Sequence, residues 1–126
     1  MGDTLRNTLT KQERLTNVKL IENLYKINES AKAFPLILIY NYHTIENITQ
    51  VMFSVSKKKF KRAVDRNKIK RLMKECYRLQ KHHFYSALEG KTIYGSLMYT
   101  GSEIPSYELI FKTFEKLIAK LNEKNG

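Results

Sequence analysis

The chain has 126 residues, of which 42% are apolar and 14 are aromatic. A chain of this length is expected to form one domain that buries about two-thirds of the surface exposed by its unfolded form. The 23 Lys and Arg residues outnumber the 12 Asp and Glu residues, which gives a net charge of +11. A charge of this size calls for an anionic partner, and nucleic acid is the leading candidate. The single cysteine, Cys76, excludes a disulfide framework, and the longest apolar run, 34–40, is too short to cross a membrane.

These features predict a cytoplasmic protein that does not contact a membrane. Residues 1–13 are polar and lack a period, so we expect a flexible N-terminal arm followed by a folded domain over 14–124. Apolar residues then recur at helical spacing from Asn17 to Ile27, which predicts a short amphipathic helix with Asn17 as its N-cap and Asn28 at its end.

The next elements predict an α/β domain. The β-rich run 34–40 predicts a strand covered on both faces, and alternation over 48–56 predicts a second strand that forms an antiparallel hairpin with the first. Residues 92–100 predict a third strand, which follows a long helix and should therefore run parallel to its neighbour in a βαβ unit. A closing helix is expected over 105–122. The elements follow the order α-β-β-α-β-α, with a mixed sheet of three to four strands packed with three helices.

The long helix holds most of the charge. Between Lys57 and Lys81 there are twelve Lys or Arg residues and two acids, a net +10. We expect this helix to run to about residue 83, before Glu89 and Gly90 break it. Its predicted core stripe at helical spacing is Ile69, Leu72, Met73 and Cys76. The opposite arc, about 100° wide, forms a basic strip that consists of Asn67, Lys70, Arg71, Lys74, Arg78 and Lys81.

A charge run of this kind is usually a solvated helix face, and from the pattern alone the two interpretations have about even odds. Five cations without an acid on one arc repel each other unless a partner is present, which favours nucleic-acid binding. His82 and His83 point apart on a helix and have no ligand cluster near them in sequence, so a surface position is the simpler interpretation. Strand tyrosines such as Tyr94 are more often core than stacking residues.

The segment from Phe53 to Glu75 resembles the protein subunit of bacterial ribonuclease P. The matching motifs are a strand that ends in Val55-Ser56-Lys57-Lys58, followed by a helix that opens with Ala63-Val64-Asp65-Arg66-Asn67-Lys68-Ile69-Lys70-Arg71. The resemblance extends from Arg14 to Glu108. It implies a left-handed βαβ crossover, against the usual preference.

The resemblance also implies a function: the protein binds a catalytic RNA and the 5′ leader of precursor tRNA, and assists metal-dependent endonucleolytic removal of the leader. Catalysis is expected from the RNA, so the chain should carry no catalytic residue and no metal ligand of its own, while the holoenzyme requires magnesium. The isolated protein is expected to be monomeric. Implied RNA-binding residues are Lys57, Lys58, Arg62, Arg66, Asn67, Lys68, Lys70, Arg71, Lys74 and Arg78. Implied residues of the leader-binding cleft are Ile21, Tyr25 and Phe53, with Ile21 standing where the family usually has an aromatic residue.

Two alternatives stay open from sequence. A general RNA- or DNA-binding module of ribosomal or nucleoid type would use the same basic strip without a nuclease role. A protein-only nuclease would need a cluster of carboxylates or histidines for its metal, and the acids of this chain are scattered.

Overall fold

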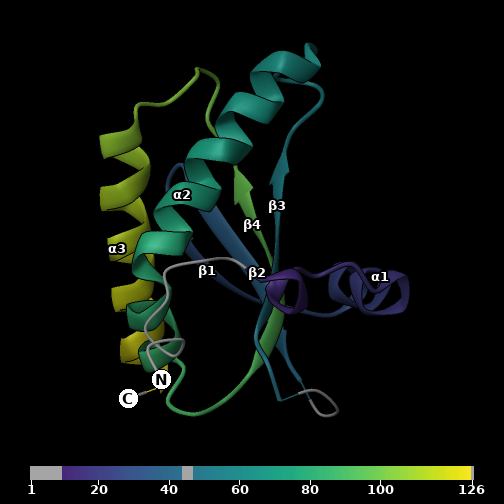
Figure 1. Ribbon diagram of the computed structural model, residues 1–126, viewed down its shortest axis with the longest axis vertical. Helices are drawn as coiled ribbons and strands as arrows, with labels where there is room; N and C mark the ends of the chain where they lie inside the picture. Colours follow the sequence, from purple (N-terminus) through teal and green to yellow (C-terminus); the bar gives the residue numbers. More distant parts are fainter. Residues whose placement is uncertain (1–9, 44–46, 126) are drawn as a thin grey trace.

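The computed structural model describes residues 10–43 and 47–125, over which the chain forms three α-helices, a short 3-10 helix and four strands (Figure 1). In chain order the elements are η2 (Lys11–Glu13), α1 (Val18–Lys26), β1 (Glu29–Ala33), β2 (Leu36–Tyr42), β3 (Gln50–Val55), α2 (Ala63–Ala87), β4 (Ile93–Tyr99) and α3 (Tyr107–Asn125). The strands form one mixed sheet in the order β1-β2-β4-β3. β3 and β4 are parallel, and the other neighbouring pairs are antiparallel.

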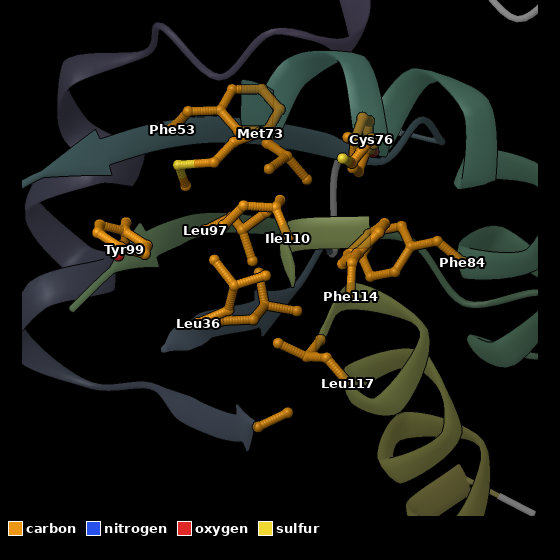
Figure 2. Packing of buried hydrophobic residues seen from close by; sticks show 14 of the residues in the cluster. Leu36, Phe53, Met73, Cys76, Phe84, Leu97, Tyr99, Ile110, Phe114 and Leu117 are labelled. Carbon is orange, nitrogen blue, oxygen red and sulfur yellow. The ribbon is translucent and has the colours of Figure 1, made fainter. Parts of the chain in front are cut away.

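Helices α2 and α3 lie side by side and cover one face of this sheet (Figure 1). The main core between them and the sheet is rich in aromatic rings: Tyr77 lies 5.5 Å from Phe84 and 5.8 Å from Phe114, measured between ring centroids. In Figure 2 the rings of Phe84 and Phe114 lie together, with 5.7 Å between their centroids. Each large apolar side chain buried in this way contributes about 1.5–3 kcal/mol. The core therefore fixes α2 on the sheet and leaves its opposite side to solvent.

Helix α1 packs on the other face of the sheet. Its N-cap is Asn17, whose side chain accepts a hydrogen bond from the backbone N–H of Leu20 at 3.1 Å. At the other end, the Asn28 side chain donates to the carbonyl of Leu24 at 2.8 Å, so Asn28 closes the helix as expected. Leu24 is buried in a second, smaller core with Ile39 and Tyr94. The sheet thus has a helix on both faces.

The predicted hairpin between strands 34–40 and 48–56 is wrong. These residues do form strands β2 and β3, but β4 lies between them and pairs with both. The antiparallel partner of β2 on its other side is β1, a strand that the sequence did not predict. A connection of this length permits a hairpin without requiring one, and the buried position of β4 decided the pairing. The predicted parallel pairing of the third strand with its neighbour is confirmed.

Helix α2 begins at Ala63 and continues to Ala87, about one turn beyond the predicted end. It ends as expected where Glu89 and Gly90 both take positive φ angles, 50° and 81°. The handedness of the crossover stays an expectation from the resemblance. Over residues 10–43 and 47–125, no helix is long and apolar enough to cross a membrane.

Most of the predicted N-terminal arm lies outside the described residues. Thr10–Glu13 are described, and they do not fit the prediction that the fold begins near Arg14. Lys11–Glu13 form η2, whose Glu13 side chain is buried, and Leu15 donates a backbone hydrogen bond to Val51 on the edge of β3. The folded part therefore includes the last residues assigned to the arm.

Candidate nucleic-acid interface

The first four turns of α2 present most of the predicted basic strip to solvent. Asn67, Arg71 and Lys74 are exposed, and Lys70 and Arg78 are half-buried. Beneath them Ile69, Met73 and Cys76 are buried as predicted, and Leu72 is half-buried. The strip exists because the apolar side chains of this helix repeat with the helical period and leave one arc polar.

Lys81 is not part of the exposed strip, contrary to the sequence prediction. Its side chain is 7% exposed, and its ammonium lies 3.1 Å from a carboxylate oxygen of Glu13. The phenol of Tyr85 also donates to this carboxylate. Lys81 thus joins the C-terminal half of α2 to η2, and its charge is paired with Glu13 inside the protein.

Six other cations of α2 and its preceding loop have no carboxylate partner among the described residues. The side chains of Lys57, Lys58, Lys68, Lys70, Arg71 and Lys74 form no ion pair with any described carboxylate. We call these six residues the cationic surface. Arg78 differs because it forms an ion pair at 2.6 Å with Glu75, one turn away on the same helix. That pair is exposed and contributes little to stability, and it reduces the net charge at this end of the strip.

Arg66 has a structural contact in addition to its predicted role. Its Nη1 donates to the backbone carbonyls of Phe60 and Lys61, at 2.8 and 2.9 Å. These two bonds hold the 57–62 loop against the first turn of α2. Arg62 is the exposed N-cap residue of α2. The loop lysines and the helix cations are therefore held in one surface by Arg66.

The predicted leader-binding residues do not all share a face. Ile21 packs beside the second core on the α1 side of the sheet, and Tyr25 on the same helix is 54% exposed. Phe53 is buried on the opposite side, where its ring meets Tyr77 of α2 with 5.5 Å between the ring centroids. Phe53 therefore does not share a face with Ile21 and Tyr25, because side chains alternate along β3 and Phe53 belongs to the helical side.

The residues of β3 that do face the α1 side are Met52 and Ser54. Ser54 bonds to Ser96 of β4 at 2.9 Å, and Met52 packs beside the second core with Met98. A hollow of about 360 Å³ continues this face, lined by Ser54, Ser56, Lys59, Met98 and Thr100. The sequence pattern could have identified these positions, because Met52, Ser54 and Ser56 alternate with the apolar residues of the strand.

The cysteine and the two adjacent histidines of α2 differ in their exposure to solvent. Burial raises the pKa of the Cys76 thiol to about 11, with a smaller contribution from Glu75, so this buried thiol is not a thiolate at neutral pH. His82 and His83 are exposed, as expected. Among residues 10–43 and 47–125, no three or more His, Cys, Asp or Glu side chains are grouped to hold a metal ion.

Comparisons with known proteins agree with this geometry. The family model for ribonuclease P matches residues 9–122. The ribonuclease P protein component of Porphyromonas gingivalis is 30% identical over 117 residues, covering 90% of this chain and 85% of the relative. That of Chlorobium phaeobacteroides is 32% identical over 127 residues, covering 89% and 86%.

Solved structures show the same fold. The RNase P protein of Staphylococcus aureus superposes with a TM-score of 0.70 at 20% identity, covering 86% of this chain and 94% of the solved chain. The RNase P protein of Thermotoga maritima gives a TM-score of 0.68 at 17% identity, covering 86% and 96%. The family model and the sequence relatives establish the family: this chain belongs to the ribonuclease P proteins, the protein component of that endoribonuclease.

Proposed function

We propose that this chain binds the RNA subunit of ribonuclease P through the cationic surface and holds the 5′ leader of precursor tRNA on the open, α1 side of the sheet. In this proposal the RNA performs the cleavage, and the protein makes the encounter of two polyanions favourable. The observation that carries it is the cationic surface itself: six Lys or Arg side chains on α2 and its preceding loop, without a described carboxylate partner.

Unpaired cations at this density repel one another, so the free protein has an electrostatic cost that an RNA backbone removes. Each phosphate that a Lys or Arg neutralises also releases condensed counterions, which favours binding at low salt. Arg71 suits bidentate contact with a phosphate, and the lysines act as point charges. Asn67 is exposed and has both a donor and an acceptor, which suits a ribose 2′-hydroxyl.

The proposed leader site uses different chemistry. Tyr25 is half-exposed beside Ile21, so it offers a ring on which an unpaired base can stack. A hollow lined by Ser54, Met98 and Lys59 lies on the same side of the sheet, where Met98 and Ile21 both pack beside the second core. A single strand lying there meets apolar side chains, hydroxyl groups and one cation. This composition suits a flexible single strand better than a rigid duplex.

We further propose that the required magnesium ions are held by the RNA and the substrate. The protein would lower the magnesium concentration needed, because its cations replace part of the counterion charge that holds the two RNAs together. We expect the protein to act as a monomer.

The test is a reconstitution with purified protein, a bacterial ribonuclease P RNA and a precursor tRNA labelled at its 5′ end, at limiting magnesium. We expect leader release in the full mixture and none with the protein alone. The double variant Lys70→Ala/Lys74→Ala should reduce release strongly. A matched control is Lys112→Ala/Lys116→Ala, which removes two exposed lysines with the same spacing from α3.

Release equal to that of the RNA alone would contradict the proposal and favour a general nucleic-acid binder. Cutting by the protein alone would favour a protein nuclease. Equal loss in the two double variants would mean that net charge, and not the cationic surface, matters.

A further inference from the structure

A second hollow lies at the end of the sheet where β4 finishes and β2 begins. It has a volume of about 530 Å³ and is mainly apolar, with walls from the β1–β2 turn, the 100–106 segment and the start of α3. Its apolar lining consists of Phe34, Pro35, Tyr99, Ile104, Pro105 and Leu109, and we call it the Phe34 groove.

The groove exposes unusually large apolar side chains. Phe34 is 81% exposed, and Ile104 and Leu109 are 42% and 45% exposed. A lone exposed apolar residue needs no explanation, but a cluster that lines one hollow is typical of a binding site. The described part of the chain leaves most of the Phe34 side chain uncovered. The ring is therefore available to a partner.

One cation, Lys59, lies beside the groove. The Lys59 ammonium donates to the carbonyl of Thr100 at 2.5 Å, and the backbone N–H of Thr100 donates to the carbonyl of Pro35 at 2.8 Å. This chain of bonds places Lys59 and its loop beside the groove wall. In Figure 1 the start of α2 lies at the same end of the sheet as the last residues of β3 and β4. The 57–62 loop and the Phe34 groove thus adjoin.

The groove itself has the opposite character. The one charged residue in its lining is Glu103, whose carboxylate disfavours a phosphate inside. An aromatic ring in an apolar hollow with phosphate-binding cations beside it suits an unpaired nucleobase, whose ring stacks while its backbone stays outside. A second copy of this chain is a poorer occupant, since two chains of charge +11 repel each other.

We propose that the Phe34 groove binds an unpaired base of the ribonuclease P RNA, with Phe34 as the stacking platform and the 57–62 loop on the flanking phosphates. The inference rests on the proposed function, because it assumes that the cationic surface binds that RNA. It adds a base contact at the Phe34 groove, which shares Tyr99 with the hollow of the proposed leader site.

The chain has no tryptophan, so a single one reports its own surroundings. In Phe34→Trp, titration with ribonuclease P RNA should quench the emission and protect the indole from acrylamide. Precursor tRNA alone should produce neither effect. The control is Ile27→Trp at the end of α1, where the native side chain is 72% exposed and lies outside the groove. Its emission should stay accessible to acrylamide.

Affinity variants separate stacking from simple apolar contact. Phe34→Ala and Phe34→Leu should each weaken binding of the RNA by about fivefold or more, the loss of one base–aromatic stack. Phe34→Tyr should bind like the native protein. Because Phe34 is exposed, all three variants should fold, and thermal unfolding followed by circular dichroism checks this.

Two results would overturn the inference alone: an indole at position 34 that RNA does not affect, or a Phe34→Leu variant with native affinity, which would point to an apolar segment of a protein as the occupant. In both cases Lys70→Ala/Lys74→Ala would still weaken RNA binding. Absence of RNA binding by the native protein would instead overturn the proposed function, and the inference with it.

Discussion

Lys81 is the cation of α2 that we expect to stabilise the fold without binding RNA. The sequence places it on the same arc as Lys74, yet the structure buries it against Glu13, with both side chains 7% exposed. Replacing Lys81 by alanine leaves the Glu13 carboxylate buried without its cation. Breaking a buried pair on one side costs about 3–5 kcal/mol. For a domain of this size that corresponds to a fall in Tm of about 11–19 °C.

The assay is urea and thermal unfolding of Lys81→Ala beside Lys74→Ala, which removes an exposed lysine from the same helix. Lys74→Ala should unfold like the native protein and bind RNA more weakly. A double variant, Glu13→Gln/Lys81→Met, should recover part of the lost stability because it leaves no unpaired charge. Native stability of Lys81→Ala, together with weakened RNA binding, would refute the reasoning and return Lys81 to the exposed strip.

Three further predictions concern other parts of the fold. Gly95→Ala should destabilise the protein by about 1–3 kcal/mol in urea unfolding, because an added Cβ would lie 2.7 Å from the backbone oxygen of Ile39 on β2. If the Gly95→Ala variant were as stable as the native protein, β2 and β4 could separate without cost. Burial tends to raise the pKa of the Glu13 carboxyl, but hydrogen bonds from Tyr85, the Thr10 N–H and Lys81 outweigh it and lower that pKa. The stabilisation from the ionised Glu13 carboxylate should therefore be fully present above about pH 4.3, the pKa of Glu in the unfolded chain. It should be lost as the pH falls through the lower pKa of the folded protein, so the difference in unfolding free energy between native protein and Glu13→Gln should shrink in acid. A difference that stays constant with pH would contradict this. Tyr25→Ala should weaken binding of precursor tRNA by about fivefold and leave binding of mature tRNA unchanged. Tyr25→Phe should bind both tRNAs with native affinity. Equal losses of affinity for the two tRNAs in Tyr25→Ala would remove Tyr25 from the leader site.

The sequence predicted the helices well because each has a clear apolar period and a recognisable end, such as Asn17 at the start of α1 and Gly90 after α2. It missed β1, whose residues Glu29–Ala33 include two alanines and two charges and have little strand character of their own. This strand forms because it pairs with β2 and buries Ala31 in the main core. Such tertiary pairing cannot be read from local pattern.

The candidate site, like the fold, was predicted from the sequence only in part. The cationic surface follows from charge and helical period, both of which are local. The burial of Lys81 depends on Glu13, which is 68 residues away in sequence, so no local pattern identifies it. Phe53 was placed in the cleft although it alternates with Met52 and Ser54, and only the position of α2 decides which side of β3 is covered. The Phe34 groove likewise joins three segments that are distant in sequence.

The most direct test of the central claim is the salt dependence of RNA binding. We would measure the dissociation constant of native protein and ribonuclease P RNA from about 50 to 300 mM monovalent salt, and repeat this for Lys70→Ala/Lys74→Ala and for Lys112→Ala/Lys116→Ala. We expect that the first pair lowers the log–log slope by about 1.4–1.8 and that the α3 pair leaves it unchanged. An equal slope for native protein and the α2 pair would contradict phosphate neutralisation by the cationic surface.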